Sequence, residues 1–109
     1  MSLDQEAQFN SIESLRKGWN GYGAEPVPRK AVDVAREIVN TIRDARLEVF
    51  PTARESVQIE CENDEGDYME AEIYGDESIH MFVLNADGSV VERDVDREEC
   101  VNRFREFLE

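Results

Sequence analysis

The spacing of apolar residues changes from a helical period to a period of two near residue 57, and this change limits the chain to a few architectures. Two stretches on either side of the turn-forming segment 63–67 alternate strictly between apolar and polar residues. Such alternation is typical of strands with one buried and one solvated face, so the two stretches predict a hairpin. Its inward-facing residues are Val57, Ile59, Cys61, Met69, Ala71 and Ile73.

Two more strands are expected after this hairpin. Residues 79–84 are apolar on both faces, which favours an interior strand covered on each side. The segment 85–88 is typical of a type I turn closed by a glycine bulge, and it predicts a further strand over 89–95. The sequence therefore predicts a four-stranded antiparallel meander.

Three segments have helical patterns. The first covers 3–17 and is followed by Gly18, which fits the position just past a helix end. The second begins at Pro28 and is expected to be the central packing element, and the third is capped by Asp96. The expected buried stripes are Leu3, Ala7, Ile12 and Leu15, with Phe9 off that stripe; Ala31, Val34, Ala35, Ile38, Val39 and Ile42; and Cys100, Phe104, Phe107 and Leu108.

This order of elements predicts a two-layer α+β domain, with two N-terminal helices and one C-terminal helix packed on one face of the sheet. At 109 residues the chain, 1–109, is expected to form a single domain. It has no apolar run near the ~18–20 residues of a membrane span and no secretion-signal layout at its N-terminus. We therefore expect a cytoplasmic protein that binds no membrane, with Cys61 and Cys100 as free buried thiols.

The net charge of −14 is concentrated in one part of the chain. Residues 1–54 carry eight acids and eight bases, 55–92 carry twelve acids and no Lys or Arg, and 93–109 carry six acids and four bases. Carboxylates in a run without cations are either solvated or paired with a partner. The lack of clustered Lys and Arg argues against direct nucleic-acid binding but is compatible with docking onto a basic protein surface or with mimicry of a nucleic acid.

The loop lengths predict which residues face each other across the sheet. They place Glu60 opposite Glu70, Glu70 opposite Phe82, and Phe82 opposite Glu92. Like charges directly opposite each other destabilise a sheet by roughly 0.2–1 kcal/mol per pair, so a face that tolerates them and also carries apolar anchors resembles an interface. The predicted partner-binding residues are Glu60, Tyr68, Glu70, Glu72, Phe82, Leu84 and Glu92.

Other interpretations of the same residues remain. The acidic face is also compatible with a solvated sheet surface that blocks edge pairing, with Phe82 and Leu84 partly covered by a helix or loop. His80 and Glu72 are expected to be neighbours, which is acid–base geometry, but no nucleophile motif or phosphate-binding glycine loop accompanies them. The acids of 63–67 lack the ligand spacing of a calcium loop, and no Cys and His have zinc spacing. We therefore assign no catalytic residue, metal or cofactor.

The segment Trp19-Asn20-Gly21-Tyr22-Gly23-Ala24, followed by an apolar helix, resembles the Trp-Asp/Asn-Gly-x-Gly/Asp-Ala signature of a family of small uncharacterised bacterial and phage proteins. A Pro-Thr pair at 51–52, ahead of a strand, also matches that family, and the resemblance spans about residues 15–90. Val27 stands where the family has a capping Ser or Asp. The resemblance implies a bacterial or phage origin and carries no catalytic or ligand residues.

We expect the glycine-rich segment to be a structural loop formed by Trp19, Gly21, Tyr22 and Gly23. Its glycines allow the backbone to turn, and its aromatic rings offer large surfaces to bury, so Trp19 is expected to fill the seam between helix and sheet. A ligand-binding loop is the alternative.

Three functions are compatible with these patterns. The first is a non-enzymatic interaction domain that presents an acidic sheet face to a basic protein. The second is an inhibitor or antitoxin-like protein that mimics nucleic-acid charge, and the third is a small-molecule enzyme or binding protein with a pocket near Trp19, Tyr22 and His80. Self-association is a further expectation, because Arg29, Arg36 and Arg43 share a helix face; pairing with Asp33, Glu37 and Asp44 on the same helix also explains that stripe.

Overall fold

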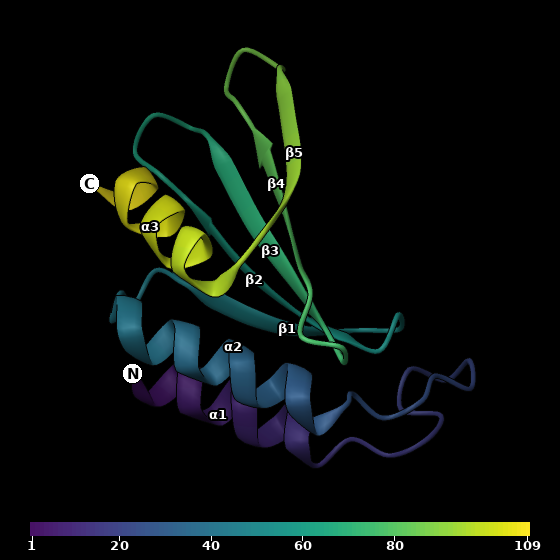
Figure 1. Ribbon diagram of the computed structural model, residues 1–109. Coiled ribbons are helices and arrows are strands. Elements are labelled where there is room, and N and C mark those ends of the chain that lie inside the picture. The colour runs from purple at the N-terminus through teal and green to yellow at the C-terminus, as the bar shows by residue number, and fades with distance from the viewer.

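The computed structural model describes residues 1–109 and has three helices and a five-stranded antiparallel sheet (Figure 1). The α+β class and the antiparallel sheet are confirmed, whereas the sheet has five strands in the order β1-β2-β3-β4-β5 and not four. The elements are α1 (Leu3–Glu13), α2 (Arg29–Ile42), β1 (Glu48–Thr52), β2 (Ser56–Glu62), β3 (Tyr68–Tyr74), β4 (Ile79–Leu84), β5 (Val90–Val95) and α3 (Arg97–Leu108).

The additional strand, β1, contains Pro51, although proline is disfavoured inside strands because it cannot donate to a ladder. β1 lies at the edge of the sheet, and its Val49 donates its backbone N–H to the side-chain Oε1 of Gln8 in α1 (3.1 Å). The backbone N–H of Val49 therefore points away from β2. The backbone of Pro51, two residues later, has the same orientation. The missing N–H of the proline is at a position where the ladder does not need it.

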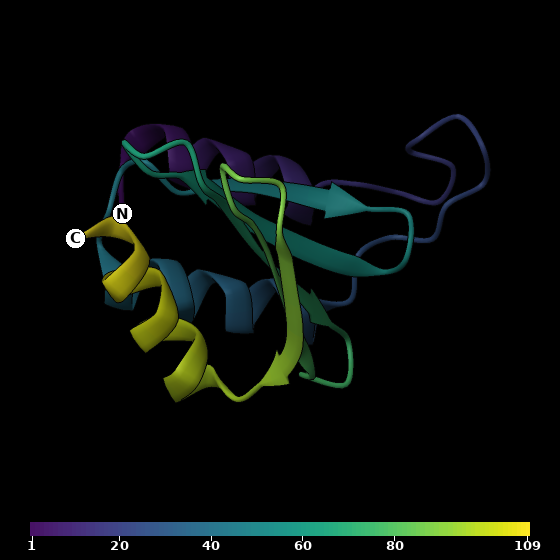
Figure 2. The same cartoon turned by 90° about the horizontal axis from the view of Figure 1, so that it is seen from above.

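The core lies between the helices and one face of the sheet. α2 packs between α1 and α3 and contacts β2 and β3, which confirms its predicted central position (Figure 2). None of the three helices combines the length and apolarity needed to cross a bilayer. The fully buried residues of this core include Phe9, Ala31, Ala35, Val39, Val57, Ile59, Ala71, Ile73, Cys100 and Phe104.

Both cysteines are free and buried, as predicted. Burial raises the pKa of Cys61 and of Cys100 to about 12, because an apolar environment disfavours the thiolate. Both side chains therefore act as small apolar core residues.

The first helix differs from the prediction in its end and in its buried face. α1 ends at Glu13, so the expected continuation to residue 17 is wrong. Leu3 is 84% exposed, whereas Phe9 is fully buried on a face that it shares with Gln5 and Ile12. The spacing of four and three residues is helical, but the polar Gln5 hides this face from a search for apolar stripes.

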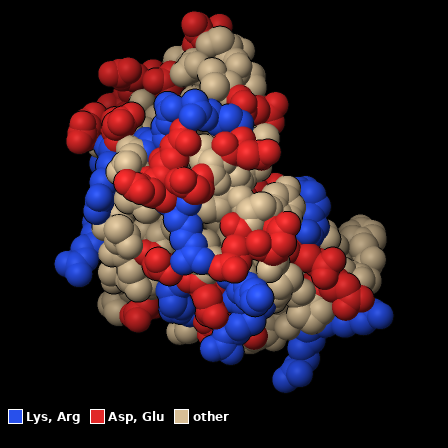
Figure 3. Space-filling view, viewed as in Figure 1, with Lys and Arg blue, Asp and Glu red and all other residues tan.

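Four of the five arginines of the helices pair with acids, and Arg105 instead donates to the carbonyl oxygen of Thr41. Figure 3, which looks onto α3, shows the two signs of charge interleaved. Within α2 only Arg29 pairs as expected, with Asp33 (3.5 Å). Arg36 reaches Glu13 of α1 (2.5 Å), and its guanidinium lies 4.8 Å from the ring centroid of Phe9. The arginine stripe on one face of α2 is therefore interrupted at Arg36, which is only partly exposed between two helices.

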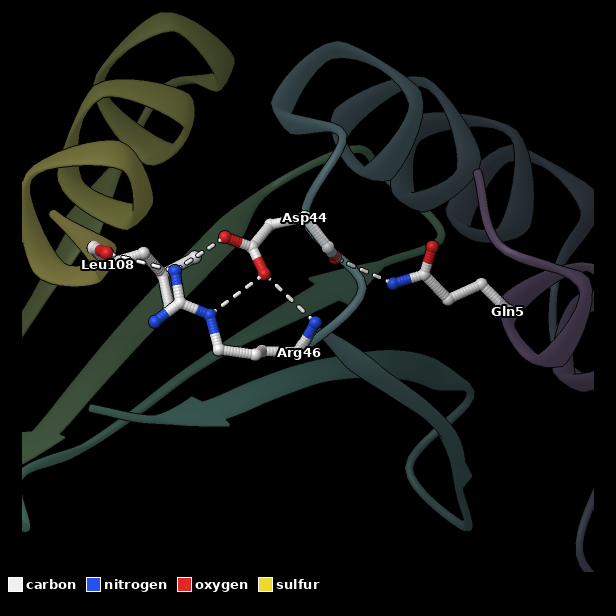
Figure 4. Close-up of polar contacts among 4 residues, drawn as sticks. All are labelled: Gln5, Asp44, Arg46 and Leu108. Carbon is white, nitrogen blue, oxygen red and sulfur yellow. Dashed lines mark hydrogen bonds and ion pairs between the residues drawn. The ribbon is translucent and has the colours of Figure 1, made fainter. Parts of the chain in front are cut away.

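Gln5 connects α1 to the segment between α2 and β1. Its Nε2 donates to the carbonyl oxygens of Asp44 (2.8 Å) and Leu47 (2.9 Å). From the same segment, Arg46 donates to Asp44 (2.7 Å) and to the carbonyl oxygen of Leu108 at the end of α3 (2.9 Å). Figure 4 shows Gln5 and Arg46 on opposite sides of this connection, which thus holds the N-terminal and C-terminal helices together.

The glycine-rich loop projects from the body of the molecule in both ribbon views (Figures 1 and 2). Its side-chain and backbone polar groups bond to one another: the Oδ1 of Asn20 accepts from Tyr22 N (2.9 Å), and Trp19 Nε1 donates to Glu25 O (2.9 Å). Gly21 and Gly23 have φ of 80° and 82°, a conformation that favours glycine.

Trp19 is half-buried outside the main core, and Tyr22 is 92% exposed. The expectation that Trp19 fills the seam between helix and sheet is therefore wrong, and the ring of Tyr22 is not buried. The loop satisfies its own hydrogen bonds, so it holds its shape without packing into that seam.

Substitution of Gln5 by Met tests the link between α1 and the α2–β1 connection. Gln5→Met keeps the side-chain length but leaves the carbonyls of Asp44 and Leu47 without their donor, so we expect the free energy of unfolding to fall by about 1–3 kcal/mol. Urea denaturation measures this change. An unfolding free energy within about 0.5 kcal/mol of the wild-type value would contradict the assigned role of Gln5.

Candidate protein-binding surface on the sheet

The sheet has one face without helices, here called the open face, and it carries the even-numbered residues of all five strands. The predicted register is the observed one: Glu60 pairs with Glu70, Glu70 with Phe82, and Phe82 with Glu92. β1 adds Glu48 opposite Glu60. These five residues form the acidic row, which crosses every strand. Tyr68, Glu72 and Leu84 lie on the same face, so all seven predicted partner-binding residues share it.

Two carboxylates of the acidic row converge on one hydroxyl. The OH of Tyr68 lies 2.7 Å from Glu60 Oε2 and 2.8 Å from Glu70 Oε2. A phenol has one proton, so it donates to only one of these carboxylates at a time. Burial, followed by the hydrogen bonds to Glu60 and Glu70, raises the pKa of Tyr68 far above its ordinary value, and the phenol stays neutral.

No cation compensates this pair. The amide Nε2 of Gln58 donates to Glu60 Oε2 (2.8 Å), but none of the ion pairs in the molecule includes Glu48, Glu60 or Glu70. Glu60 and Glu70 are both half-buried, which limits their solvation. The two partly desolvated carboxylates thus face each other and receive fewer hydrogen bonds than their oxygens can accept.

Apolar side chains lie beside these acids. The ring of Tyr68 meets that of Phe82 edge-on, with centroids 6.4 Å apart and an interplanar angle of 65°. Leu84 is 40% exposed and Phe50 is 39% exposed on the same face. β4 is therefore covered on one side only, contrary to the prediction, because all of the helices pack against the opposite face.

Glu72 differs from its neighbours because it has a cation. Arg54, in the turn between β1 and β2, donates to both carboxylate oxygens of Glu72 (2.8 and 3.2 Å), and Ser56 donates a third hydrogen bond (2.5 Å). Burial alone would raise the pKa of Glu72, but the bonds from Arg54 and Ser56 outweigh it and lower the pKa. The expectation that the acids of 55–92 lack any intramolecular counter-charge is thus wrong at Glu72, and also at Glu77, which pairs with Arg97 (2.5 Å).

His80 is held by acids of β5 and not by Glu72. Its Nδ1 lies 2.9 Å from Asp94 Oδ1, and its Nε2 lies 3.0 Å from Glu92 Oε1. Glu72 and His80 are neighbours across β3 and β4, as predicted, but their side chains form no hydrogen bond with each other, because Arg54 and Ser56 bind Glu72. The hydrogen bond to Asp94, with the bond to Glu92, raises the pKa of His80.

The expected small-molecule pocket is not among the five principal hollows of the surface. None of the five principal hollows is lined by Trp19, Tyr22 or His80. The hollow nearest the acidic row has a volume of about 400 Å³ and lies between β1, β2 and β3. No three His, Cys, Asp or Glu side chains are grouped to hold a metal ion. The hollow between β1, β2 and β3 is lined by Arg46, Glu48, Glu60, Cys61, Glu62 and Tyr68.

No protein-family model, curated protein or solved structure matches this chain. The interpretation of the open face therefore depends on its own geometry. Glu48 was not predicted from the sequence, because β1 was not predicted. Once that strand is known, its pairing with β2 places Glu48 opposite Glu60 and so in the acidic row.

Neutralising one acid of the converging pair should stabilise the fold. Glu70→Gln removes a like-charge contact and adds an amide donor, so we expect the free energy of unfolding to rise by roughly 0.2–1 kcal/mol. Urea denaturation of the variant and the wild type measures the difference. A loss of stability would mean that Glu70 has a favourable partner in the folded state.

The pKa of His80 offers a separate test of the β4–β5 geometry. Acids favour the protonated imidazole, so an NMR titration should give a midpoint above 6.5, and Asp94→Asn should lower it. The stabilising contribution of His80 is fully present below the unfolded-state pKa and is lost as the pH rises through the higher folded-state pKa. A midpoint at or below 6.5 would show that these hydrogen bonds do not form in solution.

Proposed function

We propose that this chain is a non-enzymatic cytoplasmic interaction domain whose open face binds a basic surface of another protein. One observation carries the proposal: Glu60 and Glu70 share the single hydroxyl of Tyr68 and have no cation. A Lys or Arg side chain from a partner would supply the missing donor. It would also convert a repulsive pair into a charge-assisted contact, which contributes roughly 1.5–3 kcal/mol.

The surroundings of this pair suit a protein partner better than a small ion. Phe82, Leu84 and Phe50 give an apolar area next to the acids, and apolar anchors with a polar rim are the usual plan of a protein interface. The net charge of −14 adds a long-range field that attracts basic partners and speeds their association.

Capture from a lysate of the source organism tests this function. The wild type should retain a basic protein at low salt and release it at high salt, and Glu60→Gln/Glu70→Gln should retain much less of it. Glu98→Gln/Glu106→Gln on α3 is a charge-matched control, because both of these acids are exposed and unpaired, and it should capture as the wild type does.

Capture that is identical for the wild type and the sheet variant would contradict the proposal. If the retained partner is a nucleic-acid-binding protein that duplex DNA displaces from the chain, the mimicry form of the function is supported.

A further inference from the structure

The two edges of the sheet differ in what their backbones offer. On β1, the outward residues are Val49, whose N–H is bonded to Gln8, and Pro51, which has no N–H. This edge therefore has no free backbone donor. The carbonyl groups of a strand from another molecule would find no backbone N–H on β1 to accept from.

The other edge, on β5, is open. Tyr74 N donates to Ser78 O and Asn85 N donates to Ser89 O, and these bonds close the two turns that flank β4. In an antiparallel ladder the backbone N–H and C=O groups of successive residues point alternately toward and away from the neighbouring strand. Starting from either turn, this alternation directs the backbone groups of Val91, Arg93 and Val95 toward β4. The backbone groups of Val90, Glu92 and Asp94 must then point away from the sheet.

No other part of the chain covers these outward groups. The residues of β5 are exposed except Val95, which is half-buried. None of the turn, loop or side-chain hydrogen bonds involves the backbone of Val90, Glu92 or Asp94. Three consecutive pairing positions are thus available for a further strand.

The side chains beside this edge distinguish two faces. On the open face, Glu92 and Asp94 are acidic and exposed. On the helix side, a hollow of about 50 Å³ lies beside α3 and is lined mainly by apolar side chains. Arg93 and Arg103 at its rim both pair with Glu99, so one carboxylate is shared between two guanidinium groups. The apolar residues of this hollow are Met69, Met81, Val83, Val91 and Val95.

A second copy of this chain fits the edge poorly. Each copy carries a net charge of −14, which opposes association. Antiparallel pairing of two β5 strands about Glu92 sets Glu92 against Glu92, and pairing about Arg93 sets Arg93 against Arg93. In these two registers the charges on β5 oppose self-pairing, whereas they favour a strand of opposite charge.

We propose that the β5 edge binds an extended segment of the basic partner as a sixth strand, with Lys or Arg side chains over the open face and small apolar side chains over the hollow beside α3. This inference rests on the proposed function and specifies how the partner binds. The incoming backbone would pair with Val90, Glu92 and Asp94, and its basic side chains would extend the acidic row beyond Glu92.

Amide hydrogen exchange with two synthetic peptides tests the proposal on the intact chain. The probe is the blocked peptide Lys-Val-Lys-Val-Lys-Val, and the control, Lys-Lys-Lys-Val-Val-Val, has the same charge and composition without alternation. We expect the alternating peptide to slow exchange at the amides of Glu92 and Asp94 by about tenfold or more, and the control peptide to leave them unchanged.

Variants at one position separate backbone pairing from charge. Glu92→Pro removes an outward N–H that the sheet does not use, so the fold should persist while peptide binding is lost. Glu92→Gln removes the same charge but keeps the N–H, so it should bind more weakly than the wild type and still protect the edge amides. If Glu92→Pro does not fold, exchange in the wild type alone still decides the question.

Three results would overturn the inference: equal binding of both peptides, no binding of either, or peptide-induced changes confined to Glu60, Glu70 and Phe82. The last result would leave the proposed function of the open face intact, because the peptide would then bind the face and not the edge. Protection of the edge amides, combined with partner capture that is insensitive to Glu60→Gln/Glu70→Gln, would support edge pairing and count against the acidic face.

Discussion

Burial of one side of the sheet against α2 and α3 is the constraint on which the rest of the structure depends. Val57, Ile59, Ala71 and Ile73 are all fully buried on that side. A slip of one residue in any strand pairing would turn such residues to solvent, so the register is strongly determined. The same register also determines which residues are neighbours on the open face, where it places Glu60 beside Glu70. The acidic row is therefore a consequence of core packing combined with the choice of acids at outward positions.

The helical side of the molecule and the open face of the sheet differ in how their charged side chains are paired. Around the helices, arginines such as Arg36 and Arg97 pair with acids of other elements. On the sheet, only Arg54 and His80 reach the acids, and both do so away from the converging pair of Glu60 and Glu70. The like-charge contact lowers the stability of the isolated chain. In the proposed function a cation from a partner would offset this repulsion, and in the proposed edge pairing the unpaired backbone of β5 would align the same partner.

The sequence predicts the parts of this account that depend on local patterns. Period-two alternation and loop lengths are enough for the register of β2 to β5, because turn length fixes which residues face each other. Contacts that depend on long side chains crossing between elements are not visible in such patterns. Gln5 packs inside as a polar residue, Arg54 reaches Glu72 from a turn, and Pro51 lies at an edge position that a ladder tolerates. Each of these depends on tertiary geometry.

The dependence of stability on salt tests the central claim, that Glu60 and Glu70 repel each other without a cation. Raising NaCl from about 0.01 M to about 1 M shortens the Debye length from roughly 30 Å to roughly 3 Å, so it screens repulsion between partly exposed charges. In urea unfolding, the wild type should gain more stability from salt than Glu60→Gln/Glu70→Gln does, and the α3 control Glu98→Gln/Glu106→Gln should gain as much as the wild type. An equal gain in the wild type and the sheet variant would contradict the account.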